Sequence, residues 1–316
     1  MDELISVVMT TYNHEKYIAQ AIESVLSQDY INFELIIVDD GSTDQTKTII
    51  ERYEDDRIYK IYKTNSGVSD ASNEGIKIAK GKWIALMSGD DISRTDRLKV
   101  EYEYVKTNGY NIVMSLPQLI DENGQELADS YYGTFFMNCD FVFKKVFRRL
   151  FLEGNYLCAP TAFIKKDIIL EVGGFKRSLL QLQDYAMWLE ISKKYDIPVI
   201  SERLVFYRQH SNNLSSTQNN KRLYFEFKHI FRDILNGVHW DFLNEVFPDN
   251  FTVKSRYNEM NFSIEKALLL VQNPIPSVSV VGLELLAKYF DIEIYSEKLL
   301  SYYGFSMQLF FEKSNM

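Results

Sequence analysis

Apolar and polar positions alternate regularly over roughly the first ninety residues. Short runs of consecutive apolar, β-favouring residues are separated by stretches in which apolar residues recur at helical spacing. This pattern predicts three helices, at 14–28, 43–53 and 69–79, and four strands, at 4–10, 33–39, 57–63 and 82–87. Strands alternating with helices indicate parallel βαβ units, and nearly continuous apolar strands indicate a sheet covered on both faces. We therefore predict an α/β fold whose mostly parallel, Rossmann-like sheet is flanked by helices.

Beyond these units the pattern divides the chain once more. The middle third is less regular, and after about Ser216 the strand signal fades. The later pattern predicts helices at 221–236, 253–272 and 276–289. We therefore predict an α/β domain at 1–216 and a helical C-terminal region at 217–316. The aromatic, amphipathic stretch 295–313 suits covering the core, dimerising or touching a membrane, and the pattern does not choose among these roles.

One helix predicted in the middle third, "FVFKKVFRRLFL" at 141–152, separates apolar from basic residues. Its apolar face carries Phe143, Val146, Phe147, Leu150 and Phe151, and its other face carries Lys144, Lys145, Arg148 and Arg149. An interfacial helix that touches an anionic membrane or a lipid-linked substrate has this composition. A surface helix that packs its apolar side on the core has it too, and that arrangement is the commoner one.

Composition excludes some classes of function. A chain of 316 residues with a net charge of −9 has room for a full core, but its acidity argues against nucleic acid as the main partner. Cys139 and Cys158 lack the spacing of a metal or disulfide motif, so we expect reduced thiols. The sequence has neither a recognisable signal peptide nor an apolar run of membrane-spanning length, and we expect a cytoplasmic protein.

Polar clusters follow three of the predicted strands. They read "TTYN" after the first strand, "DDGSTD" after the second and "SGDD" after the fourth. Ligands of parallel sheets bind beyond the carboxyl ends of the strands, where these clusters meet. An isolated pair of aspartates is usually a turn or a helix cap. Two pairs at one edge, Asp39–Asp40 and Asp90–Asp91, favour instead a site for a divalent cation and a polyanion.

Four stretches together carry a family resemblance. They are 5–46, 65–91 ("NSGVSDASNEGIKIAKGKWIALMSGDD"), 173–191 ("GGFKRSLLQLQDYAMWLEI") and 207–215 ("YRQHSNNLS"). In this order they resemble the inverting family 2 glycosyltransferases of the GT-A fold, over residues 4–216. The resemblance implies that 1–216 is the catalytic domain, and it does not extend to the C-terminal hundred residues.

The resemblance also implies roles for individual residues. Asp40 matches the aspartate that accepts a hydrogen bond from a nucleobase imide, which favours uracil. Asp184 matches the catalytic base, although an aspartate before an apolar-periodic run is also a good helix N-cap, and nearby Trp188 offers a face for sugar stacking. The residues implied to bind the nucleotide sugar are Thr10, Tyr12, Asp40, Ser42, Asn73, Asp90 and Arg208.

A divalent Mn²⁺ or Mg²⁺ is implied as well, with Asp90, Asp91 and His210 as its ligands. A lone histidine such as His210 is more often an ordinary polar contact. The chain departs from the family pattern at two positions, since Ser88 replaces the first acid of the metal motif and Ser72 replaces a phosphate-binding arginine. Arg208 and Lys82 are the candidate replacements for that missing cation.

The resulting hypothesis is a metal-dependent inverting glycosyltransferase that uses a nucleotide-diphosphate sugar, with UDP as the favoured nucleotide. Its expected acceptor is a hydroxyl of a surface glycan or a lipid-linked oligosaccharide, which implies peripheral contact with the inner face of the cell membrane. Two alternatives remain: a nucleotidyltransferase that makes sugar nucleotides, and a catalytically silent module that binds glycans or scaffolds an assembly. The sequence leaves the donor sugar, the linkage and the oligomeric state open.

Overall fold

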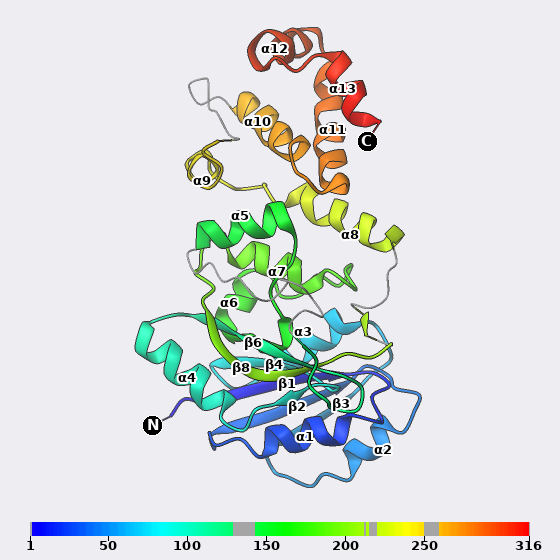
Figure 1. Ribbon diagram of the computed structural model, residues 1–316, viewed down its shortest axis with the longest axis vertical. Coiled ribbons are helices and arrows are strands. Elements are labelled where there is room, and N and C mark those ends of the chain that lie inside the picture. The colour runs from blue at the N-terminus through cyan, green and yellow to red at the C-terminus, as the bar shows by residue number, and fades with distance from the viewer. Residues whose placement is uncertain (1, 129–142, 212, 215–219, 250–258, 316) are drawn as a thin grey trace. The chain divides into compact units, whose positions relative to one another are not determined.

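The computed structural model describes residues 2–128, 143–211, 213–214, 220–249 and 259–315. The chain forms two compact units (Figure 1). The first comprises Met1–Val146 and Tyr156–Gln218, and the second comprises Phe147–Asn155 and Asn219–Met316. The predicted boundary at 216/217 lies outside the described residues. Residues 147–155, which we placed in the α/β domain, belong to the second unit.

The first unit is built on an eight-stranded mixed sheet of order β3-β2-β1-β4-β7-β6-β8-β5. Adjacent strands are parallel in β3-β2-β1-β4 and in β6-β8, and antiparallel in β4-β7, β7-β6 and β8-β5. The strands are β1 Ile5–Thr11, β2 Phe33–Asp39, β3 Ile58–Tyr62, β4 Trp83–Ser88, β5 Ile92–Ser93, β6 Ile112–Ile120, β7 Phe163–Lys165 and β8 Val199–Arg208. Because β7 alone is reversed between them, β4, β6 and β8 all end at the same edge of the sheet.

Helices cover both faces of this sheet, as Figure 1 shows for α1 and α2 on one side and α3 on the other. The helices of this unit are α1 Ile18–Leu26, α2 Thr46–Glu51, α3 Val68–Ile78, α4 Arg97–Asn108, α6 Lys166–Glu171 and α7 Gln183–Ile191, with a 3₁₀ turn at Ala159–Thr161. The predicted alternation over the first ninety residues is therefore confirmed. The strands β6 and β8 and the helix α4 lie in the stretch whose pattern was too irregular to assign.

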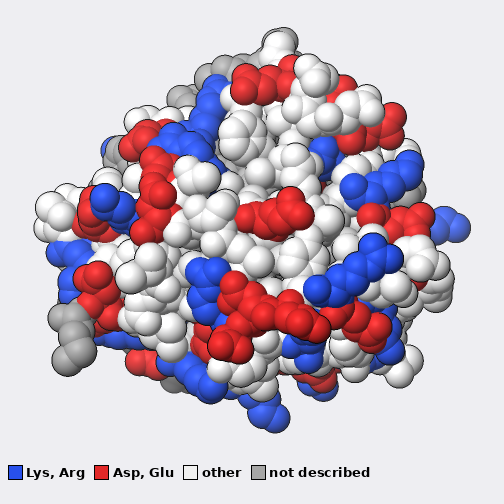
Figure 2. Space-filling view, turned by 90° about the horizontal axis from the view of Figure 1, so that it is seen from below, with Lys and Arg blue, Asp and Glu red and all other residues white. Residues whose placement is uncertain are grey.

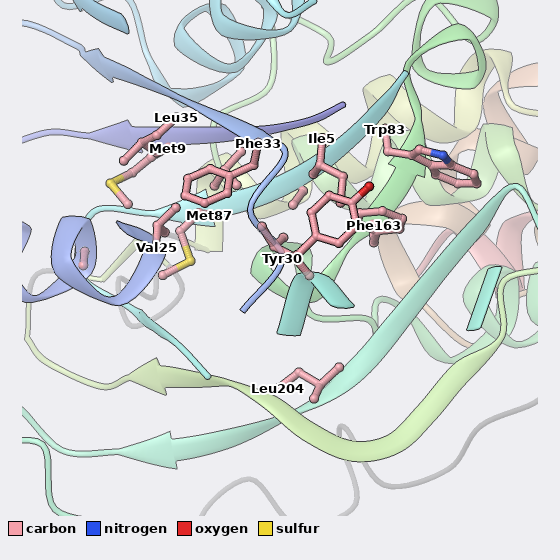
Figure 3. Close-up of a cluster of buried hydrophobic side chains, with 14 of the residues drawn as sticks. Ile5, Met9, Val25, Tyr30, Phe33, Leu35, Trp83, Met87, Phe163 and Leu204 are labelled. Atoms are coloured by element: carbon pink, nitrogen blue, oxygen red, sulfur yellow. The ribbon is translucent and has the colours of Figure 1, made fainter. Parts of the chain in front are cut away.

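The main core lies between the sheet and α1. Alternate residues of the central strands, such as Met9 and Leu35, are fully buried there against Val25 of α1 (Figure 3). Strand side chains alternate between faces, so Val8 and Val38 point to the opposite side, toward α3. Both faces of these strands are apolar because both are covered by helices.

Helix α3 lies unusually close to the sheet at Gly75. A Cβ atom at this position would lie 2.5 Å from Cγ1 of Val8 and 3.1 Å from Cγ2 of Val38. Glycine is therefore required here by close packing rather than by backbone conformation, since a helix interior normally disfavours it.

We expect Gly75→Ala to destabilise the protein by a net of about 1–2 kcal/mol. The destabilisation from overpacking against the two valines exceeds the stabilisation from the better helix propensity of alanine. Urea denaturation measures the change. Lys77→Ala on the exposed side of the same helix is the matched control and should leave stability nearly unchanged. A Gly75→Ala protein more stable than the wild type would contradict the close packing.

The second unit is helical, as predicted for the C-terminal region. It contains α8 Asn220–Asp233, α9 Trp240–Val246, α10 Glu259–Val271, α11 Pro276–Phe290, α12 Glu293–Tyr303 and α13 Met307–Ser314. The pattern did not predict α9. α10 agrees with the predicted helix at 253–272 as far as it is described, and residues 253–258 of that prediction lie outside the described residues. A second apolar cluster, which includes Ile264, Leu286 and Leu299, forms its core.

The amphipathic helix α5, Phe143–Glu153, packs on this second unit. Phe147 and Phe151 are fully buried, and their rings contact Phe247 at centroid distances of 6.3 and 4.9 Å. The backbone oxygen of Phe151 also accepts a hydrogen bond from Nδ2 of Asn273. The apolar face of α5 is therefore occupied by the protein itself, which makes the membrane interpretation of this helix wrong and the packing interpretation right.

Figure 2 shows acidic and basic side chains interspersed on one face of the molecule, without a continuous basic area. Within the described residues, no helix combines the length and the apolar content needed to cross a membrane.

Candidate functional site

The carboxyl ends of β1, β2 and β4 bring the three polar clusters together, as predicted. Thr11 pairs with Asp39, and Thr10 pairs with Ser88, in the parallel registers of the sheet. The loops continue this pairing, since the backbone N–H of Asp40 donates to the oxygen of Thr11 and that of Gly89 donates to the oxygen of Thr10, both at 2.9 Å.

A polar network locks the loop after β1 to the loop after β2. The backbone N–H of Asn13 donates to Oγ of Ser42, and the backbone N–H of Thr43 donates to Oδ1 of Asn13. The N–H of His14 donates to Oγ1 of Thr46 at 2.8 Å. Residues 42–45 are engaged in this network and in the turn, so α2 begins at Thr46 rather than at the expected Thr43.

Asp39 and Asp40 have different roles in these loops. Oδ1 of Asp39 accepts hydrogen bonds from the backbone N–H and the hydroxyl of Ser42, which closes the turn. Oδ1 of Asp40 accepts from Nζ of Lys63 at 2.8 Å and from the N–H of Ser66 at 3.0 Å, and its Oδ2 accepts from the N–H of Gly67 at 2.8 Å. The two acids do not share a cation. Asp40 holds the loop that leads from β3 to α3.

We expect Asp40→Asn to destabilise the protein by about 1–3 kcal/mol, because it removes the charge that pairs with Lys63 and one acceptor of a buried group. If Asp40 also accepts a hydrogen bond from a nucleobase, as the resemblance implies, the variant should in addition lose its preference for uridine diphosphate over cytidine diphosphate. Calorimetric titration with both nucleotides separates the two effects. Lys63→Met is the matched control, because it removes the same ion pair and leaves the carboxylate available to a base.

The metal ligands implied by the sequence are only partly brought together. Asp90 and His210 lie in one cluster with His14, and one ligand atom from each lies within 4.8 Å of the others. Oδ2 of Asp90 is 2.9 Å from Nε2 of His210 and 3.7 Å from Nε2 of His14. Ser88, at the position of the family's first acid, donates its hydroxyl to Oδ1 of Asp90. One carboxylate oxygen and two imidazole nitrogens form a chemically suitable donor set for a divalent transition-metal ion.

The charge state of Asp90 suits this role. Burial alone raises the pKa of the carboxyl group. Electrostatic interaction with His14 and the hydrogen bonds from His210 and Ser88 outweigh burial and lower the pKa to about 2. Asp90 is therefore a carboxylate at neutral pH.

Asp91 does not belong to this cluster, in contrast to our expectation. It is almost fully buried, and its Oδ1 accepts the backbone N–H of Arg208 at 2.8 Å. Its Oδ2 has no hydrogen-bond partner among the described residues. Burial, reinforced by the charge of Asp90, raises the pKa of Asp91 well above its usual value. Asp91 anchors the end of β8, and His14 takes the place in the cluster that we expected Asp91 to fill.

Arg208 is committed to the architecture of the site. Its buried guanidinium donates to the backbone oxygens of Asp90, Asp121 and Glu122 and to Oε1 of Gln20. It also lies 4.7 Å above the ring of Tyr17, which stacks on His210 at a centroid distance of 5.0 Å. The prediction that Arg208 contacts a diphosphate stays untested, and these contacts give its N–H groups other acceptors.

The other cation that we named, Lys82, lies at the wrong edge of the sheet. It precedes β4, whereas the site follows the end of that strand, about 20 Å away for a strand of this length. Its Nζ pairs with Oε1 of Glu3 at 2.7 Å. Lys82 is therefore excluded as a diphosphate ligand.

The remaining nucleotide-binding predictions stay untested, but their positions are clear. Tyr12 is 44% exposed beside the loop network and is available to a ligand, whereas Thr10 is half-buried in β1. Ser42 belongs to the network described above. The side chain of Asn73 makes two hydrogen bonds to the backbone of Phe175. Its Nδ2 donates to the oxygen of Phe175, and its Oδ1 accepts from the N–H of Phe175. Asn73 thus ties α3 to the segment that leads to α7.

Asp184 lies in the first turn of α7 and is half-buried. The N-cap of this helix is Leu182, so the alternative N-cap role of Asp184 is wrong. Burial raises the pKa of the Cys158 thiol well above its usual value, and the charges of Asp91 and Asp184 raise it further. The expected sugar-stacking role of Trp188 is wrong, because that side chain is fully buried. Cys139 lies outside the described residues.

The sequence analysis did not select His14, which the structure places in the cluster. A single histidine in a loop has no spacing pattern, and its partners Asp90 and His210 are distant in the chain. The only available signal was that "TTYNH" follows a strand at the predicted ligand edge. The loop of His210 is also fixed by a residue that we did not select, since Asn213 accepts from the N–H of His210 and donates to the oxygen of Arg208.

The comparisons with known proteins decide the family. The family model described as glycosyl transferase family 2 matches residues 6–173. An uncharacterized glycosyltransferase of Methanocaldococcus jannaschii is 32% identical over 229 residues, which are 70% of this chain and 76% of that protein. The chain belongs to glycosyl transferase family 2. The family predicted from the motifs is therefore confirmed, and with it the enzyme class.

Other relatives of this family 2 glycosyltransferase extend the comparison. TuaG of Bacillus subtilis, whose name assigns it to teichuronic acid biosynthesis, is 28% identical over 76% of this chain and 93% of its own length. Some relatives are much longer, and the chain spans only 31% or 32% of their length. The structure of S. aureus TarS 1–349 with UDP-GlcNAc superposes with a TM-score of 0.62 at 22% identity, covering 96% of this chain and 92% of that one. This likeness confirms the predicted fold, including the helical C-terminal region.

Proposed function

We propose that this protein transfers a sugar from a UDP-sugar to a glycan hydroxyl with inversion, using a divalent cation held at Asp90. The observation that carries the proposal is the cluster of His14, Asp90 and His210 at the ligand edge of the sheet. The UDP-GlcNAc in TarS supports a UDP-sugar as the donor here.

The roles that we propose for these side chains describe a single displacement. Asp184 receives the proton of the acceptor hydroxyl as that oxygen attacks the anomeric carbon. Asp90 and His210 would hold the cation, which would supply positive charge that stabilises the departing diphosphate. Arg208 and Asn213 keep His210 in place. Because no enzyme nucleophile takes part, the configuration at the anomeric carbon inverts.

The acceptor class rests on the relatives rather than on the site. The name of TuaG supports a cell-surface polysaccharide. A lipid-linked acceptor would bring the enzyme to the inner face of the membrane as a peripheral protein, and α5 does not supply that contact because its apolar face is buried. The contact would have to come from another part of the chain.

A donor screen tests the proposal. The protein is incubated with Mn²⁺ and a panel of sugar nucleotides without acceptor, and hydrolysis is followed by release of the nucleoside diphosphate. We expect turnover with one or more UDP-sugars and none after chelation with EDTA. No turnover or binding over the full panel would favour the silent glycan-binding module. Release of pyrophosphate from UTP and a sugar phosphate would favour the nucleotidyltransferase.

A further inference from the structure

The ring of His14 is left without a hydrogen-bond partner in the described part of the chain. Its Nδ1 is buried and accepts or donates no hydrogen bond. Its Nε2 is 3.7 Å from Oδ2 of Asp90, which is too long for a hydrogen bond. Nε2 therefore faces the carboxylate without bonding to it, and a cation held between the two atoms would give the ring a partner there.

The backbone fixes His14 in this position independently of its ring. Its N–H donates to Oγ1 of Thr46, and its oxygen accepts from the N–H groups of Tyr17 and Ile18, both at 2.9 Å. The ring meets that of His210 edge-on, with centroids 6.1 Å apart. The loop after β1 thus brings one imidazole, that of His14, to the carboxylate of Asp90. The loop after β8 brings the other, that of His210.

We infer that His14 is a third protein ligand of the divalent cation, and that the site consequently selects Mn²⁺ and similar transition-metal ions over Mg²⁺. Mg²⁺ prefers a shell of oxygen atoms, with several waters retained. Imidazole nitrogen suits first-row transition metals better, and two imidazoles with one carboxylate leave positions open for diphosphate oxygens. This inference rests on the proposed function only in assuming that a cation binds at Asp90.

Metal binding to the whole protein tests the inference without reference to catalysis. Mn²⁺ and Mg²⁺ are titrated separately by calorimetry, with and without UDP, and bound Mn²⁺ is examined by pulsed EPR for couplings to imidazole nitrogen. We expect Mn²⁺ to bind on the order of tenfold or more tightly than Mg²⁺. We expect signals from two imidazoles in the wild type and from one in His14→Ala, with Mn²⁺ affinity at least about tenfold weaker in the variant.

The control variant is His229→Ala, which removes an imidazole from α8 in the second unit and should change neither measurement. His14→Ala retains the backbone hydrogen bonds of the loop, and its thermal transition checks that it is folded. The inference is overturned if His14→Ala binds Mn²⁺ like the wild type, if Mg²⁺ binds as tightly as Mn²⁺, or if the wild type binds no Mn²⁺ even with UDP. Two-imidazole binding in a protein that turns over no sugar nucleotide would support the inference and overturn the proposed function instead.

Discussion

Asp184→Asn should lower the rate of sugar transfer by about 10²–10⁴-fold and leave nucleotide binding unchanged. Asparagine has nearly the same shape as aspartate, but its amide cannot take a proton from an acceptor hydroxyl. The residue lies in the first turn of α7 and is half-buried. Transfer kinetics under saturating donor, together with calorimetric titration of UDP, measure the two quantities.

Asp167→Asn is the matched control for this variant. Asp167 lies in the first turn of α6, so the substitution removes the same favourable interaction with a helix N-terminus at an exposed position. Its transfer rate should stay near that of the wild type. Equal losses of UDP affinity and transfer in Asp184→Asn would show a structural role for this residue, and an unchanged rate would exclude it as the base.

Arg97→Met should destabilise the protein by about 3–5 kcal/mol at pH 8. Arg97 and Glu101 form a fully buried ion pair on α4, with Nε of the arginine 3.0 Å from Oε1 of the glutamate. Removing the guanidinium leaves a buried carboxylate without its cation. Burial raises the pKa of Glu101 to about 7 even though Arg97 works against it, and the substitution should raise that pKa further.

The sign of the pH dependence follows from this shift. A carboxyl group whose pKa is higher in the folded than in the unfolded protein makes the folded protein less stable as pH rises. The loss of stability that Arg97→Met causes should therefore be larger at pH 8 than at pH 5.5. Denaturant midpoints at both pH values measure it, with Arg97→Met/Glu101→Leu as the control. Replacing the whole pair with apolar residues is often nearly neutral, so a double variant as unstable as the single one would contradict the explanation.

The site shows which inferences were possible from local sequence. Asp90 was predicted because two acids follow a strand and a glycine, and a ligand edge was predicted because three polar clusters follow parallel strands. The roles of Asp39 and Asp40 separated only in the structure, where the first closes its own turn and the second holds a loop more than twenty residues away, through Ser66 and Gly67. Asp91 looked equivalent to Asp90 in the sequence, and their partners distinguish them, since Asp90 lies with His14 and His210 whereas Asp91 accepts the backbone N–H of Arg208.

The sequence by itself determined the alternation of β1 to β4 with α1 to α3, because strand and helix periodicities depend on neighbouring residues. It also determined that the three polar clusters meet at one edge, since parallel strands end there together. Only the tertiary structure decided which residues form the cluster of His14, Asp90 and His210. β8 runs parallel to β4 and ends at the same edge, which brings His210 to Asp90 across 120 positions of the chain. Such contacts depend on the order of the strands in the sheet, which the local hydrophobic pattern does not reveal. For that reason His14 was identified only from the structure.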